Sequence, residues 1–244
     1  MSVGTGRHGE GQRMTAKRTK EPQFDYHVAL RDEEGLETFG LMSNQTWRDD
    51  PKRLAFLLSR YKFVAKMLEG KKSAIEIGCA DAFGTRIVRQ VVPRVVATDF
   101  DPLFIEDAKQ HASSKWPIEF AVHDILEGPV KGGFEAAFSL DVIEHIPAAN
   151  ERQFMRNVAA SLTPDGVAII GTPSLESQAY ASPASKIGHV NCKTAAALKA
   201  LAGEHFVNVF LFSMNDEVVH TGFYPMAHYL LALCCGTRAT APEP

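Results

Sequence analysis

Residues 73–84 read Ser-Ala-Ile-Glu-Ile-Gly-Cys-Ala-Asp-Ala-Phe-Gly. The apolar run 73–77 predicts a short buried strand, and the pattern from position 83 to position 91 predicts a helix. The turn between them contains only small residues around Gly78 and Asp81. Such a turn lets a ligand approach the backbone, and the first amides of the following helix favour negative groups. Taken alone, the same pattern also fits a simple tight turn.

A second feature lies one strand further along the chain. The strand predicted at 95–98 ends at Asp99, which follows Gly78 by 21 residues. A carboxylate at that point can accept hydrogen bonds from both hydroxyls of a ribose lying across the strand ends. Alternatively, an aspartate here caps the helix that opens at Pro102, and Asp101 fits that role at least as well. The spacing favours a nucleoside site with Asp99 at the ribose.

The glycine spacing distinguishes between two kinds of nucleoside. A dinucleotide fold favours glycine at positions 78, 80 and 83, but this chain has Ala80 and Phe83. Glu76 would repel a bound pyrophosphate, whereas it suits a ligand with a cationic amine. S-adenosylmethionine carries an amino acid and a sulfonium and has no phosphate. The loop therefore favours methyl transfer over hydride transfer.

Strands and helices alternate over most of the chain. Besides the segments already named, we expect helices at 51–68, 102–112, 148–162, 193–202 and 224–235, and strands at 118–122, 134–140, 167–171, 206–212 and 218–221. Alternation of this kind builds a parallel sheet covered by helices. The two last strands flank a turn at Asn215 and Asp216, which is a hairpin signal. The prediction is an α/β, Rossmann-like, seven-stranded and mostly parallel sheet with helices on both faces and a C-terminal antiparallel hairpin.

The domain organisation is predicted to be simple. Residues 26–236 are expected to form a single domain, with a disordered tail at 1–25 and a flexible tail at 237–244. Hydrophobic residues make up 45% of the 244 residues and charged residues 23%, which excludes a mainly disordered chain. The formal net charge of −3 does not favour nucleic acid as a partner.

Neither the apolar segments nor the cysteines point outside the cytoplasm. The longest apolar segment, 223–235, has 13 residues and includes Pro225, so no membrane span is expected. Four cysteines at positions 79, 192, 234 and 235 fit neither a zinc site nor a disulfide framework. We therefore expect reduced thiols and a cytoplasmic location.

Four segments together resemble one known family. They are 76–84, the strand end at Asp99, Asp124 after the third strand, and 139–146, which reads Ser-Leu-Asp-Val-Ile-Glu-His-Ile. In order and spacing they resemble the class I S-adenosylmethionine-dependent methyltransferases over roughly residues 45–215. The Asp-Val-Ile-Glu-His run is similar to the small-molecule branch that includes the ubiquinone-biosynthesis O-methyltransferases.

The resemblance implies a cofactor role for ten positions. Glu76, Gly78 and Ala80, with the small residue Cys79 between them, would line the methionine end. Asp99 would hold the ribose and Phe100 would lie against the adenine, whose edge Asp124 and Ile125 would address. Leu140 would pack beneath the cofactor, and Arg60 matches an arginine that contacts the cofactor in the ubiquinone branch. The family usually has glycine where this chain has Ala80 and Ala82.

The methyl acceptor is less well defined. An oxygen acceptor needs a base near neutral pH, and histidine is the default candidate. The candidate catalytic residues are His189, His145 and Asp141, with His220 and His228 as weaker alternatives. Asp141, Glu144 and His145 also match positions that some ubiquinone-branch enzymes use for a divalent cation. In the alternative interpretation the last two only cap a turn, so metal use is left undecided.

The acceptor pocket is expected around Trp47, residues 172–188 and residues 215–224. The polar composition of the middle segment suggests a polar small molecule such as a sugar or another hydroxylated metabolite, methylated on oxygen or nitrogen. The predicted helix 224–235 offers a surface for a homodimer. Two other functions are retained: a NAD-dependent oxidoreductase, and a catalytically silent module that binds cofactor for regulation.

Overall fold

The computed structural model describes residues 18–238 of the chain. Residues up to Thr38 and residues from Phe39 onward form two separate compact units. In the first unit a 3₁₀ helix, η1 (Pro22–Phe24), leads directly into α1 (Asp25–Glu34). Much of the two predicted tails, residues 1–17 and 239–244, lies outside the described residues, and the predicted domain bounds remain a prediction.

The second unit is built on one sheet of eight strands. Their order is β3-β2-β1-β4-β5-β8-β6-β7. The first five are parallel neighbours: β1 (Ser73–Ile77), β2 (Arg94–Asp99), β3 (Glu119–Val122), β4 (Phe134–Leu140) and β5 (Leu162–Pro173). The predicted mostly parallel α/β sheet is confirmed, with β1 and β4 at the predicted residues. Strand β5 begins five residues before the strand expected at 167–171, and its register against β4 shifts in this added part.

Seven helices of the described second unit precede or connect these strands. They are α2 (Leu41–Asp49), α3 (Pro51–Leu68), α4 (Thr85–Arg89), α5 (Pro102–Gln110), α6 (Glu151–Ala160), α7 (Pro183–Gly188) and α8 (Ala195–Gly203). Short 3₁₀ helices complete the loops: η2 (Ile143–His145), η3 (Ala148–Asn150), η4 (Glu176–Tyr180) and η5 (Tyr224–Met226). Helix α3 begins at Pro51. Proline suits this position because the first turn of a helix leaves its backbone N–H groups unpaired, and proline has none.

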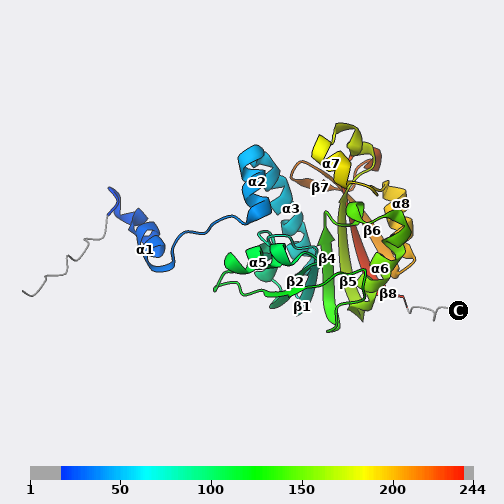
Figure 1. Cartoon of the computed structure of the whole chain (residues 1–244), viewed down its shortest axis with the longest axis horizontal. Helices are drawn as coiled ribbons and strands as arrows, with labels where there is room; N and C mark the ends of the chain where they lie inside the picture. The colour runs from blue at the N-terminus through cyan, green and yellow to red at the C-terminus, as the bar shows by residue number, and fades with distance from the viewer. Residues whose placement is uncertain (1–17, 239–244) are drawn as a thin grey trace, which may run out of the picture. The chain divides into compact units, whose positions relative to one another are not determined.

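Each face of the sheet is covered by its own helices (Figure 1). On one face, Val64 and Leu68 of α3 pack with Phe138 of β4. On the other face, Phe154 of α6 and Leu198 of α8 pack in the same core. Neighbouring residues of a strand point to opposite faces, so a strand buried on both sides has no polar alternation. This arrangement places the carboxyl ends of β1, β2, β4 and β5 along one edge.

The C-terminal region corrects one prediction. The segment expected to be a helix at 224–235 is η5 followed by β8 (Tyr229–Thr237). Strand β8 is antiparallel to both β5 and β6, and lies between them. Most residues of β8 are buried, and its sequence is therefore almost entirely apolar. Such a run lacks the alternation of polar and apolar residues by which a strand is recognised in a sequence. The homodimer surface inferred from a helix there has no structural basis.

The predicted hairpin is confirmed, and β8 is not part of it. Strand β6 (Phe206–Asn215) turns back into β7 (Val218–His220), with Asp216 at φ +50° in the turn. The sheet therefore has eight strands, one more than predicted. Among the described residues, none of the helices combines the length and apolar character that a membrane span requires.

Candidate active site

A cleft of about 660 Å³ opens at the carboxyl ends of the central strands. Its volume falls within the range of about 300–1,000 Å³ that is usual for small-molecule sites. Residues from several elements line it. They include Met42, Ser43, Gln45 and Thr46 of α2, Arg60 and Tyr61 of α3, Gly78, Cys79, Ala80 and Asp81 after β1, Leu140, Asp141, Glu144 and His145 at the end of β4 and beyond, Ser177, Gln178, Ser182, Ser185 and His189 after β5, and His228 with Tyr229 at the start of β8. The predicted residues 215–224 and Trp47 do not line it in the described part of the chain.

The loop after β1 has an unusual backbone. Gly78 has φ +76°, and Ala80 and Ala82 have φ +46° and +52°. A Cβ added at Gly78 would lie 2.3 Å from Val142 Cγ2, so the loop and the segment after β4 approach closely only because position 78 is glycine. Only glycine adopts positive φ without steric cost, and the two alanines therefore hold the loop in a strained form.

Asp99 braces this loop from β2. Its Oδ2 accepts a hydrogen bond of 2.9 Å from the amide of Ala80, and its Oδ1 accepts one of 3.0 Å from the amide of Asp101. Asp101 is the cap of α5, with its Oδ1 accepting from the amide of Leu103 at 2.9 Å. Asp101 therefore caps α5, whereas Asp99 holds the loop after β1, and its role at a ribose stays a prediction.

The other residues expected around the adenosine lie outside the cleft lining. The ring of Phe100 is 70% exposed. The Oδ1 of Asp124 accepts from the amide of Leu126 at 2.8 Å, and Ile125 is buried. Among the described residues, those that line the cleft do not include Asp99, Phe100, Asp124 or Ile125.

Glu76 lies buried beneath the loop. Its Oε1 accepts a 2.8 Å hydrogen bond from the hydroxyl of Tyr61, and its Oε2 accepts from the hydroxyl of Thr85. Burial raises the pKa of Glu76 to about 8, against the effect of these two donors. The cleft lining includes Tyr61 but not Glu76. Cys79 is buried in the same loop, and burial raises the pKa of its thiol, which agrees with a filling role.

Arg60 and Asp141 form an ion pair within the cleft. Arg60 Nη1 lies 2.6 Å from Asp141 Oδ2, and the guanidinium carbon lies 3.8 Å from the centre of the Tyr229 ring. The Nε of Arg60 and the hydroxyl of Tyr229 are buried without a hydrogen-bond partner among the described residues. Tyr229 was missed because its segment was assigned to a helix. Asp141 itself has φ +58°.

Glu144, His145 and His189 meet in the same part of the cleft. Glu144 is fully buried, its Oε2 accepts from the Thr172 hydroxyl at 3.1 Å, and its Oε1 has no partner in the described structure. The rings of His145 and His189 lie 5.2 Å apart at 70°. Potential ligand atoms of the three side chains all lie within 4.8 Å of one another.

The two weaker histidine candidates are placed differently. His220 lies outside the cleft lining, and both its ring nitrogens are occupied, one by Asn215 Oδ1 at 2.9 Å and the other by the amide of Gly222 at 2.9 Å. His228 lines the cleft but does not belong to the group formed by His145 and His189.

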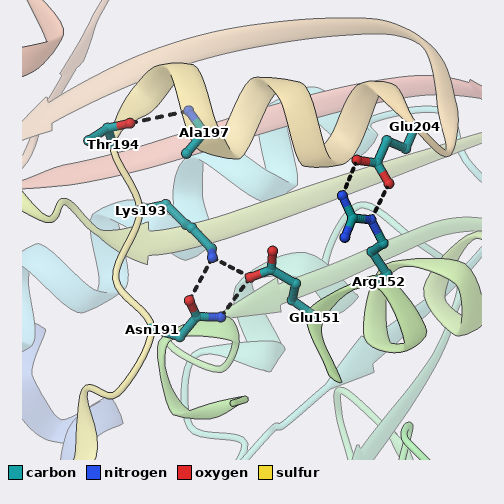
Figure 2. A network of polar contacts seen from close by, with 7 residues as sticks. All are labelled: Glu151, Arg152, Asn191, Lys193, Thr194, Ala197 and Glu204. Carbon is teal, nitrogen blue, oxygen red and sulfur yellow. Dashed lines mark hydrogen bonds and ion pairs between the residues drawn. The ribbon is translucent and has the colours of Figure 1, made fainter. Parts of the chain in front are cut away.

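A polar network fixes the segment that carries His189 (Figure 2). Asn191 donates a 2.9 Å hydrogen bond to Glu151 and accepts one of 2.6 Å from Lys193, which also pairs with Glu151. The amide of Asn191 donates to the carbonyl of Glu144 at 2.9 Å. The segment after α7 is therefore attached both to α6 and to η2.

Comparisons with known proteins agree with this geometry. Residues 74–166 match the family described as a methyltransferase domain. A mitochondrial ubiquinone biosynthesis O-methyltransferase of Arabidopsis thaliana is 24% identical over 72% of this chain and 60% of that protein. A probable S-adenosylmethionine-dependent methyltransferase of Mycobacterium tuberculosis is 27% identical over 42% of this chain and 36% of its own length. The chain thus spans less than two thirds of either relative.

A similar fold occurs in a solved structure. The N-methyltransferase NodS of Bradyrhizobium japonicum, in complex with S-adenosyl-L-homocysteine, superposes with a TM-score of 0.57 at 20% identity. The superposition covers 82% of this chain and 93% of NodS. At this identity the likeness concerns the fold.

Proposed function

We propose, from its similarity to S-adenosylmethionine-dependent methyltransferases, that this protein transfers a methyl group from S-adenosylmethionine to an oxygen or nitrogen of a polar small molecule. The observation that carries the proposal is the strained loop of Gly78 and Ala80, which lines the cleft and is joined to Asp99. The hydrogen bond between Asp99 and Ala80 places the carboxylate at the end of β2 beside a loop that leaves room for a ligand.

Asp99 is the proposed ribose ligand. Its two oxygens each accept one backbone amide. A carboxylate has about four lone-pair sites, so two remain for the ribose hydroxyls. The amides hold the carboxylate in place, which prepares it to accept further hydrogen bonds.

The charges around the loop favour this cofactor over a nicotinamide dinucleotide. The carboxylates of Asp81 and Asp99 are close enough to Glu76 to raise its pKa through their charges, after the larger effect of burial. The charges of Asp81 and Asp99 would repel a pyrophosphate and attract a cationic amine. In this assignment Gly78, Cys79 and Ala80 surround the methionine end, and Leu140 lies beneath the cofactor.

The remaining assignments complete the cofactor site. Phe100 is proposed to cover the adenine, and its exposed ring leaves a face for stacking. Asp124 and Ile125 are proposed to contact the adenine edge. Arg60, already paired with Asp141, is proposed to contact the cofactor, and both residues line the cleft.

The reaction needs alignment above all. Bound S-adenosylmethionine supplies a methyl group on a positively charged sulfur: the acceptor lone pair forms the new bond to carbon while the carbon–sulfur bond breaks and its electrons stay on sulfur. Holding acceptor and methyl group in line accounts for much of the acceleration in such reactions. His145 and His189 line the cleft and are proposed to hold the acceptor atom and assist loss of its proton.

The part of the cleft where we propose that the acceptor binds favours a polar substrate. Ser177, Gln178, Ser182 and Ser185, which follow β5, line the cleft there. Hydroxyl and amide groups of this kind pair with hydroxyls of a ligand, and an apolar ligand would leave them unsatisfied. A sugar or another hydroxylated metabolite is therefore the acceptor class to assay first.

Two substitutions test the cofactor site. Asp99→Ala should weaken binding of S-adenosylhomocysteine by about 1–3 kcal/mol, or roughly 5- to 150-fold, because the ribose loses its acceptor. Asp101→Ala is the matched control: it removes the α5 cap at a cost of about 1 kcal/mol of stability, yet should leave the affinity unchanged. Equal affinities for both variants, measured by calorimetry, would place the ribose elsewhere.

Transfer of labelled methyl groups to a panel of hydroxylated and amine metabolites tests the activity. Turnover is expected with at least one acceptor. Cofactor binding without any turnover across the panel would favour the silent regulatory module instead.

A further inference from the structure

We propose that Asp81, in the loop after β1, is a positioning residue that holds helix α2 against the cofactor end of the cleft. The proposal rests on the proposed function, because the ligand that α2 would cover is S-adenosylmethionine. Docking of α2 and binding of the cofactor then stabilise each other. The docking of α2 itself can be measured without any ligand.

Carboxylates from two other elements hold the N-terminus of α2. Oδ2 of Asp81 accepts a 2.6 Å hydrogen bond from the amide of Ser43. Oδ2 of Asp107, in α5, accepts one of 2.8 Å from the amide of Leu41. The N-cap residue of α2, Gly40, has no side chain to make such a bond. The first amides of a helix lack partners within it and favour negative groups, so the two aspartates take the place of a local cap.

Gly40 lets the helix approach both aspartates. It is buried, and a Cβ added there would overlap the Cβ of Asp81 and lie 2.6 Å from Oδ2 of Asp107. Its φ of −77° and ψ of −179° are open to any residue. Close contact, and not an unusual backbone, therefore accounts for glycine at this position. A side chain at position 40 would push α2 away without changing any residue of the cleft lining.

The packing of α2 alone contributes little to its docking. Its buried residues are Ser43 and Thr46, whereas Leu41, Met42 and Trp47 are almost half exposed. Burial of hydroxyl-bearing residues supplies little of the hydrophobic stabilisation that usually holds a surface helix in place. A helix of nine residues is also too short to be stable by itself. Beside its contact with α3 (Figure 1), α2 therefore depends on the bonds to Asp81 and Asp107.

Asp81 joins α2 to the loop that is proposed to hold the cofactor. Its Oδ1 accepts a 3.2 Å hydrogen bond from the amide of Phe83 in its own loop, while its Oδ2 reaches α2. Ser43 and Thr46 of the helix line the same cleft as Ala80 of the loop. A ligand that contacts both is bound more tightly when α2 is docked. Such coupling is reciprocal, so the cofactor in turn stabilises the docked helix.

Hydrogen exchange of the full chain without ligand tests the docking. Asp81→Ala and Gly40→Ala should each speed exchange of the α2 amides by about 2- to 30-fold, the effect of losing an N-cap. Asp81→Asn should restore exchange to within about twofold of the wild type, because its amide oxygen still accepts from Ser43. Gly203→Ala is the matched control, since a Cβ there would meet open space. Unchanged exchange in both Asp81→Ala and Gly40→Ala would overturn the proposal.

Calorimetric titration with S-adenosylhomocysteine tests the coupling. Gly40 and Asp107 lie outside the cleft lining, yet Gly40→Ala and Asp107→Ala should each weaken binding by about 2- to 30-fold, because α2 is no longer held. In the wild type, S-adenosylhomocysteine should slow exchange of the α2 amides by about fivefold or more. Weaker binding in Asp81→Ala alone, with wild-type affinity in the other two variants, would mean that Asp81 acts on the ligand directly and not through α2.

The two measurements separate this proposal from the proposed function. A wild-type chain that binds no S-adenosylhomocysteine contradicts the proposed function, while hydrogen exchange still decides whether Asp81 holds α2. Binding with equal affinity in the wild type, Gly40→Ala and Asp107→Ala refutes the coupling alone. If a circular-dichroism melt shows that Gly40→Ala does not fold, Asp107→Ala gives the same comparison from α5.

Discussion

Replacing Ala80 by glycine should stabilise this protein, against the usual effect of such a change. Ala80 is held at φ +46°, where a side chain clashes with its own backbone. Relief of that clash is worth about 1–2 kcal/mol, and the greater freedom of glycine in the unfolded chain takes back about 0.5–1 kcal/mol. Since Ala80 is half-buried, little packing is lost. We expect a net gain of about 0.5–1 kcal/mol in the free energy of unfolding.

The matched control is Ala200→Gly in α8. Ala200 is an exposed helical residue with no such strain, so the same substitution should cost about 0.8–1 kcal/mol there. Urea denaturation of both variants gives the two differences directly. A loss of stability in Ala80→Gly equal to that in Ala200→Gly would show that the loop stores no strain, and the account of the loop would be wrong.

Two further predictions concern buried polar groups. In the folded protein the pKa of Glu76 is about 8, above the ordinary value of 4.5 for a glutamate, so its contribution to stability is complete below pH 4.5 and is lost as the pH rises to about 8. Glu76→Gln should remove this pH dependence and exceed the wild type in stability at pH 9, as measured by urea denaturation. Asn191→Ala should lower the free energy of unfolding by about 1–2 kcal/mol, because the part-buried Glu151 loses a hydrogen-bond donor. The control Arg152→Ala breaks only the exposed ion pair with Glu204 and should cost at most about 1 kcal/mol. Thermal melts that rank the two variants in reverse would contradict the importance of the network in Figure 2.

Much of the fold could be predicted because local signals agreed with the tertiary structure. Helix α3 carries both Pro51 at its start and an apolar stripe, and strand β1 runs straight into a glycine. Strand β8 lacked such signals. It lies in the sheet between β5 and β6, and its burial removes the period by which a strand is recognised.

The candidate site was predictable only in part. Gly78, Cys79 and Ala80 could be placed at the cleft because they follow the strand β1 directly, whereas the ribose role of Asp99 stays a prediction. Tyr229 could not, because it lies in the segment that was assigned to a helix. The approach of His189 to Glu144 depends on contacts such as the Asn191 amide with the Glu144 carbonyl, and no local pattern contains them.

The central claim is that the cleft at the β1 loop binds an adenosyl amino acid and no phosphate-bearing nucleotide. Calorimetric titration of the full chain with S-adenosylhomocysteine and, separately, with NAD⁺ tests it most directly. The account predicts one site for S-adenosylhomocysteine and no measurable heat with NAD⁺. Binding of NAD⁺ with none of S-adenosylhomocysteine would contradict it.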